Sequence, residues 1–174
     1  MGRLKFATVW LGGCSGCHMS FLDLDEWLIE LAQHVDVVFS PLADVKEYPD
    51  NVDLVLVEGA VANDENLDMI RKVRARTKTL IALGDCAITG NVTALRNPLG
   101  VALEVLRPVY GENYPNEPRI VPVLLDRVLA VHEVVPVDHY VPGCPPPASR
   151  IKAVLQALLE GKAPALEGNE IRFG

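Results

Sequence analysis

Residues 4–11 read LKFATVWL and run directly into residues 12–17, which read GGCSGC. The first stretch has the length and the apolar content of a buried strand. The second is a glycine-rich turn in which two residues separate Cys14 from Cys17. In an open α/β sheet, ligands bind in the crevice beyond the carboxyl ends of the strands. A strand that ends on two cysteines therefore predicts both a fold class and a place for its chemistry.

Short apolar segments alternate with amphipathic ones along the rest of the chain. This alternation is typical of βαβ units around a parallel sheet, and we expect an α/β fold with a doubly wound, flavodoxin-like sheet. The expected strands are residues 4–11, 35–39, 54–57 and 79–83, with strand-like pieces at 121–125, 128–131 and 137–141, and the expected helices are 19–34, 64–76 and 148–160. Residues 97–118 hold four prolines and show no clear periodicity. We expect one domain over residues 1–162 and a peripheral tail over residues 163–174.

The composition argues against several classes of function. The net charge is −7 and no Lys/Arg stripe offsets it locally, which argues against nucleic-acid binding. No stretch approaches the roughly 20 apolar residues that span a bilayer, so we expect no membrane insertion. The first residues contain no secretion signal and no twin-arginine pair, and we therefore expect a cytoplasmic protein. In that compartment the four cysteines are expected to stay reduced rather than form disulfides.

Every cysteine lies just past the end of an expected strand. Cys14 and Cys17 follow the first strand, Cys86 follows the fourth, and Cys144 follows a late strand-like segment. The four thiols can therefore meet at one edge of the sheet, although 68 residues separate Cys17 from Cys86 and 57 separate Cys86 from Cys144. A [4Fe–4S] cluster needs four thiolates, and a Cys-x-x-Cys turn supplies two of them. We interpret the four cysteines as the ligands of one such cluster, with loops at the C-terminal strand ends holding it.

Four other interpretations remain open on the residues alone. A structural zinc site usually combines two close pairs of cysteines, whereas this chain has one. A thioredoxin-like redox pair would use Cys14 and Cys17 but leave Cys86 and Cys144 without a role. Cysteines buried for packing alone are a third reading, weakened by the loop contexts of Cys86 and Cys144. A carrier of FMN in the same crevice is the fourth.

Several residues beside the cysteines are candidates for supporting the cluster. The backbone at Gly16 can donate N–H groups to cluster sulfides. Glu58 closes the third strand and so faces the same crevice, and Gly59 follows it; both are candidates for a role beside the cluster. For Glu58, a surface or capping carboxylate is an equally good reading. Ser15 suits either a hydrogen bond to a cluster sulfur or simply the turn, and His18 is expected to be partly exposed at a helix start. No catalytic set of Ser, His and Asp or of paired carboxylates is visible, so we expect no substrate chemistry in this chain alone.

Four motifs in order along residues 4–160 resemble the small subunit of [NiFe] hydrogenases. They are Trp10-Leu11-Gly12-Gly13-Cys14-Ser15-Gly16-Cys17, Val57-Glu58-Gly59-Ala60, Gly84-Asp85-Cys86-Ala87 and Val137-Asp138-His139-Tyr140-Val141-Pro142-Gly143-Cys144-Pro145-Pro146. The resemblance is strongest to the cytoplasmic, NAD-reducing, bidirectional type. It implies a flavodoxin-like fold and a proximal [4Fe–4S] cluster on Cys14, Cys17, Cys86 and Cys144, with Glu58 next to that cluster. It also implies two partners: a large subunit with a Ni–Fe centre, and a diaphorase that carries FMN and further Fe–S clusters and reduces NAD⁺.

Departures from related families sharpen this resemblance. Periplasmic uptake hydrogenases carry a twin-arginine signal and a C-terminal extension for further clusters, and this sequence shows neither. The related quinone-site subunit of respiratory complex I has two adjacent cysteines where this chain has Cys14-Ser15-Gly16-Cys17, which makes that family the runner-up. The apolar segment Pro98–Tyr114 is a candidate docking surface, or equally a long loop folded over its own core.

Overall fold

The computed structural model describes residues 2–112, 114, 117 and 120–173. Its centre is a parallel sheet of five strands in the order β2-β1-β3-β5-β7. These strands are β1 (Leu4–Trp10), β2 (Val35–Phe39), β3 (Val52–Glu58), β5 (Thr77–Leu83) and β7 (His139–Val141). Counted within the sheet alone, the order is 2-1-3-4-5, which is the flavodoxin-like arrangement. The predicted fold class is confirmed.

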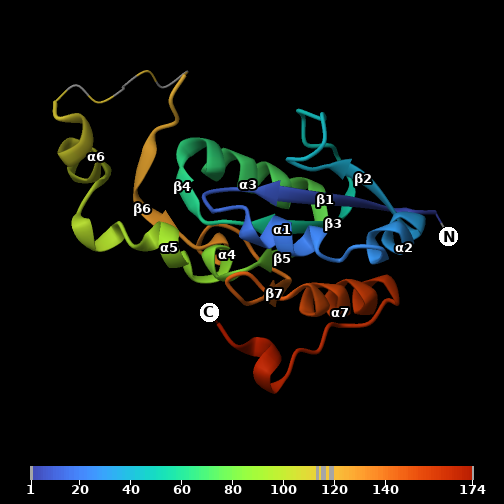
Figure 1. The fold of residues 1–174 in the computed structure, drawn as a ribbon. Helices are drawn as coiled ribbons and strands as arrows, with labels where there is room; N and C mark the ends of the chain where they lie inside the picture. The colour runs from blue at the N-terminus through green and yellow to red at the C-terminus, as the bar shows by residue number, and fades with distance from the viewer. Residues whose placement is uncertain (1, 113, 115–116, 118–119, 174) are drawn as a thin grey trace.

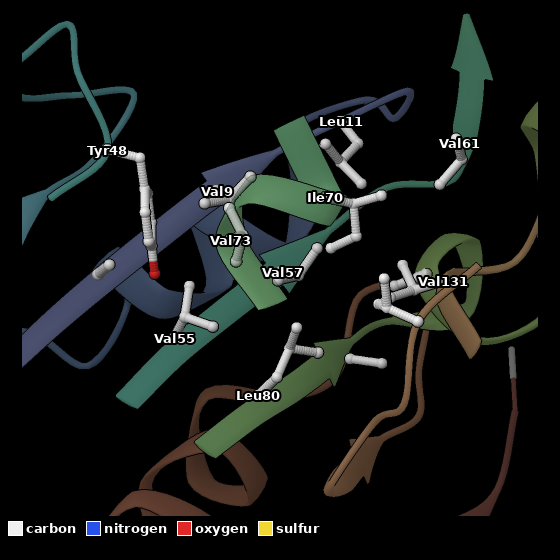
Figure 2. Close-up of a cluster of buried hydrophobic side chains, with 14 of the residues drawn as sticks. Val9, Leu11, Tyr48, Val55, Val57, Val61, Ile70, Val73, Leu80 and Val131 are labelled. Atoms are coloured by element: carbon white, nitrogen blue, oxygen red, sulfur yellow. The ribbon is translucent and has the colours of Figure 1, made fainter. Parts of the chain in front are cut away.

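Helices cover both faces of this sheet, as Figure 1 shows for α3 (Asp64–Arg76) and α7 (Ala148–Leu159) on opposite sides. Successive residues of β3 feed two separate hydrophobic clusters, because side chains in a strand alternate between faces. Val55 and Val57 pack with α3 in the cluster shown in Figure 2. Leu54 and Leu56 pack with α7 and with the helices that follow β1. Burial on both faces explains why the central strands are continuous apolar runs rather than alternating ones.

The helix expected over residues 19–34 is wrong as a single element. The structure has α1 (Gly16–Leu22) and α2 (Trp27–His34), joined by a turn in which Asp25 adopts a left-handed conformation with φ 49°. Aspartate tolerates this conformation better than most residues and favours turns over helix interiors. Leu24 lies in this turn and is buried. Its apolar side chain fits the helical spacing of the sequence because it packs into the core, although the backbone is not helical there.

The region between β5 and β7 is more regular than expected. The structure has α4 (Asp85–Thr89), α5 (Asn91–Ala94), η1 (Asn97–Leu99) and α6 (Ala102–Tyr110) in what the sequence predicted to be a strand end and an unpatterned loop. Pro108 lies inside α6, where its missing N–H removes one helical hydrogen bond near the end of the helix. The expectation of an irregular segment over residues 97–118 is therefore wrong for residues 97–99 and 102–110, which are helical, while residues 113, 115, 116 and 118 lie outside the described part of the chain.

A second, two-stranded sheet lies outside the main one. It pairs β4 (Val61–Asn63) with β6 (Leu124–Leu129) in antiparallel fashion, and η2 (Val131–Glu133) follows. The two strand-like pieces expected around residues 121–131 thus form one strand that never joins the parallel sheet. In Figure 1, α6 and β6 extend to the left of the main sheet.

The C-terminal segment ends in η3 (Gly168–Ile171). Arg150 on α7 donates hydrogen bonds to the carbonyls of Asn169 and Arg172, at 2.9 and 3.3 Å. The division into a domain over residues 1–162 and a tail over 163–174 stays a prediction, and residues 1 and 174 lie outside the described part. Within the described ranges, no helix has the length and apolar character needed to cross a bilayer.

Candidate metal centre

All four cysteines line one small cavity at the carboxyl edge of the sheet. Cys14 comes from the loop after β1 and Cys17 from the first turn of α1, while Cys86 lies in α4 directly after β5 and Cys144 in the loop after β7. The cavity has a volume of about 80 Å³, and all four thiols are free. Cys17 and Cys86 are buried, whereas Cys14 and Cys144 are exposed. The structure therefore brings together the four side chains that the sequence selected and leaves one side of their cavity open.

Backbone hydrogen bonds tie the cysteine-bearing loops to one another. Gly12 and Ala60 exchange N–H···O bonds of 2.9 and 2.8 Å, which join the loop after β1 to the loop after β3. The Asp85 N–H donates to the Gly143 carbonyl at 3.0 Å, and the Gly143 N–H donates to Asp85 Oδ1 at 2.6 Å. Asp85 thereby positions Cys144 relative to Cys86. The Gly-Asp-Cys motif is visible in the sequence, but nothing there indicated this role for Asp85.

Glu58 lies at the end of β3 with only 1% of its surface exposed. Its carboxylate accepts the backbone N–H groups of Cys17 at 3.4 Å and of His18 at 2.9 Å, and it also contacts His18 Nδ1. The carboxylate thus satisfies two of the N–H groups that the start of α1 leaves without helical partners. Glu58 thus supports the start of α1 and lines the cavity from a buried position, and its role beside a cluster stays a prediction. His18 is buried, with 5% exposed, which corrects the expectation of a partly exposed residue.

Two glycines beside the cysteines have no room for a side chain. At Gly84, φ is +81° and an added Cβ would lie 2.2 Å from Cys17 Sγ. At Gly59, φ is +90° and an added Cβ would lie 2.9 Å from the backbone of Leu11 and Gly12. Both positions require a residue that tolerates positive φ and a close backbone approach. The glycines around the cysteines are therefore part of how the loops converge.

The other predicted supporting residues divide into two kinds. The Gly16 N–H donates to Cys14 Sγ at 3.4 Å, and a hydrogen bond from it to a cluster sulfide stays a prediction. Ser15 adopts a left-handed conformation with φ 66°, and its side chain does not cap α1, which agrees with the turn reading. Asn91, which was not among the expected residues, places Nδ2 3.3 Å from Cys144 Sγ. Its only signal in the sequence was its place after Gly90, in a turn that requires positive φ.

The electrostatics of the site oppose free thiolates. Burial raises the pKa of Cys17 far above its ordinary value, and the negative charges of Glu58 and of the other cysteines add to the effect. Burial likewise raises the pKa of Cys86. A group of positively charged irons would offset this cost, because metal ligation stabilises thiolates. The donor set and the cavity thus fit an iron–sulfur cluster.

The same geometry bears on the alternatives. Among the described side chains, no three or more His, Cys, Asp or Glu groups are placed to hold a single metal ion. The cavity of about 80 Å³ is also far smaller than the roughly 300–1,000 Å³ typical of sites for small molecules and cofactors. This weakens the reading of the cavity as an FMN site. Cys86 and Cys144 line the cavity together with Cys14 and Cys17, which weakens the reading of an isolated redox pair.

Comparison with known proteins finds one matching family and similar subunits of hydrogenases. Residues 14–158 match the family described as NADH ubiquinone oxidoreductase, 20 Kd subunit. A subunit of the F420-non-reducing hydrogenase from Methanothermobacter marburgensis is 41% identical over 92% of this chain and 54% of its own length. The delta subunit of the NAD-reducing hydrogenase HoxS from Cupriavidus necator is 36% identical over 92% of this chain and 81% of its own length.

A solved structure extends this likeness to the whole backbone. A chain in the crystal structure of an NAD⁺-reducing [NiFe]-hydrogenase in the H₂-reduced state superposes with a TM-score of 0.93 at 39% identity, covering 99% of this chain and 100% of that one. By contrast, this chain spans about half the length of the F420-non-reducing relatives it matches.

Proposed function

Because this chain belongs to the family of the NADH ubiquinone oxidoreductase 20 Kd subunit, and within it to the small subunits of [NiFe] hydrogenases, we propose that it is the electron-transfer subunit of such an enzyme. It would hold one [4Fe–4S] cluster, the proximal one, on Cys14, Cys17, Cys86 and Cys144. The observation that carries the proposal is the convergence of these four thiols on one cavity from three separate segments of the chain, those that follow β1, β5 and β7.

Each part of the site has a task in this function. The four cysteines would supply the thiolates, and the cluster, when bound, supplies one-electron transfer. Glu58 fixes the turn that holds Cys17, and Asp85 fixes the loop that holds Cys144. The chain contributes positioning and electrostatics, and H₂ activation would belong to a partner.

A covering partner is supported by the open side of the cavity. Cys14 and Cys144 are exposed, and the exposed apolar side chains that lie close to them in sequence or on the following helices include Trp10, Met19, Val92, Leu95 and Leu99. Exposed apolar side chains gathered in one region mark protein–protein contact sites. We propose that the Ni–Fe large subunit covers this side. Leu103, Val109 and Tyr110 on α6 are also exposed, and they belong to the predicted docking segment Pro98–Tyr114, of which residue 113 lies outside the described part of the chain.

We propose the NAD-reducing type for the whole assembly, with a diaphorase that carries FMN and further Fe–S clusters, working in the cytoplasm. Support comes from the superposition over the full length of a chain from an NAD⁺-reducing enzyme. An F420-non-reducing hydrogenase is the alternative assembly, since several relatives are subunits that carry that name. A complex I-like quinone-site subunit is a further alternative, because the matching family is named for that enzyme.

Anaerobic purification tests the cluster and the partners together. The chain should hold about four irons and four sulfides, the content of one cube, and it should co-purify with a nickel-containing protein. H₂-dependent NAD⁺ reduction by the assembly supports the NAD-reducing type, whereas H₂-dependent reduction of a viologen dye without NAD⁺ reduction favours the F420-non-reducing type. Stoichiometric zinc without iron in fresh material would refute the cluster.

A cysteine variant tests the ligand assignment. Cys144→Ser should lose or degrade the cluster while the circular dichroism of the fold is kept. Ser149→Ala, a change at an exposed position on α7, is the matched control and should retain full iron content. Full iron and activity in Cys144→Ser would show that the assignment is wrong.

A further inference from the structure

Asn91 is the first residue of the short helix α5, and its side chain faces the cysteines. Its Nδ2 lies 3.3 Å from Cys144 Sγ, within hydrogen-bond reach of a sulfur acceptor. The backbone there is unusual, because Gly90 has φ +81° and Asn91 has φ +33°. Asparagine is among the few side chains that adopt positive φ readily. The turn therefore admits a residue that also carries an amide donor.

The residues after Asn91 face a different sulfur. Against the larger opposite effect of burial, the Thr93 side chain and the Val92 N–H lower the pKa of the Cys86 thiol. The Thr93 hydroxyl also donates to the Gly12 carbonyl at 2.9 Å, and its single proton cannot serve both acceptors. Within the described part of the chain, Asn91 is thus the side chain whose donor faces a cysteine sulfur without a second acceptor competing for it.

A hydrogen bond to a ligand sulfur changes the balance between cluster oxidation states. Reduction adds negative charge to the cluster and its thiolates, and a donor at the sulfur stabilises the more negative state. We propose that Asn91 is a positioning residue that acts through Cys144, raising the reduction potential of the cluster. The proposal rests on the proposed function, since it requires that Cys144 ligates a cluster.

Two variants separate the donor from the backbone. Asn91→Asp keeps the size of the side chain, replaces the donor by an acceptor and adds negative charge. Asn91→Gly removes the donor and keeps a residue that tolerates positive φ. Asn63→Asp makes the same chemical change at the N-cap of α3, where the Asn63 oxygen accepts the Asn66 N–H, a role that aspartate fills equally well.

The readout is an EPR-monitored redox titration of the anaerobically purified protein, with whatever subunits accompany it. At the wild-type midpoint, the reduced-to-oxidised ratio should fall about three- to tenfold in Asn91→Asp, tenfold being about 59 mV for a one-electron couple. It should fall less in Asn91→Gly and stay unchanged in Asn63→Asp. Iron and sulfide content should match the wild type in all three.

The possible failures are distinguishable. A wild-type chain without iron overturns the proposed function and this inference with it. A wild-type cluster with an unshifted midpoint in both Asn91 variants overturns the inference alone. Loss of the cluster from both Asn91 variants also overturns it, because Asn91 would then hold the cluster in place rather than set its potential.

Discussion

Glu58 is the buried carboxylate on which the start of α1 depends, and replacing it by alanine should be costly. The change would leave the His18 N–H, the more weakly bonded Cys17 N–H and the His18 ring without their acceptor, in a place where Glu58 exposes 1% of its surface. Each buried donor left unsatisfied costs about 1–3 kcal/mol, and the change removes the acceptor of both the His18 N–H and the His18 ring. We expect Glu58→Ala to lower the free energy of unfolding by about 3–5 kcal/mol, a large part of the roughly 5–15 kcal/mol typical of domains.

Urea denaturation of the metal-free chain under reducing conditions, followed by circular dichroism, measures this loss. Glu58→Gln should lose about half as much, because its amide oxygen still accepts one of the N–H groups. Glu47→Ala is the matched control, since Glu47 is exposed and lies 3.8 Å from Lys72 in a surface pair worth about 0–1 kcal/mol. A loss below about 1 kcal/mol in Glu58→Ala would refute the reasoning that the carboxylate anchors α1.

Three further predictions concern the cavity. Gly84→Ala should lower iron content in purified protein several-fold or more, because its Cβ would lie 2.2 Å from Cys17 Sγ at φ +81°; normal iron content would contradict this. Asp85→Ala should cost about 1.5–3 kcal/mol in urea denaturation, because the buried Gly143 N–H loses a charged acceptor; an unchanged midpoint would show that this bond is dispensable. Iron uptake by the metal-free chain should strengthen as pH rises, by about tenfold per pH unit for each proton released, because raised pKa values keep Cys17 and Cys86 protonated at neutral pH. Reconstitution at pH 6.5 and 8.0 checks it, and equal uptake at both would oppose it.

The sequence-based expectations of helices were wrong at two places, around Leu24 and around Pro108. Leu24 suits the spacing of a helix that includes Phe21 and Trp27, yet it is buried from a turn, because the left-handed Asp25 breaks the backbone there. The helix α6 was not expected, because a proline usually argues against a helix. Pro108 nevertheless removes only one hydrogen bond near the end of α6. Both errors lie in backbone geometry that apolar periodicity does not report.

The sequence by itself determined the parallel sheet and the four thiols. Apolar runs of strand length specify buried strands, and a cysteine placed just past a strand end must lie at the carboxyl edge of such a sheet. The support around the thiols was decided only by the tertiary structure. Glu58 meets His18 across 40 residues, Asn91 meets Cys144 across 53, and Asp85 meets Gly143 across 58. A hydrogen bond requires its angle to be favourable and its distance to be correct within a few tenths of an ångström. The order of residues along the chain does not specify these quantities, because they are set only when the strands have paired.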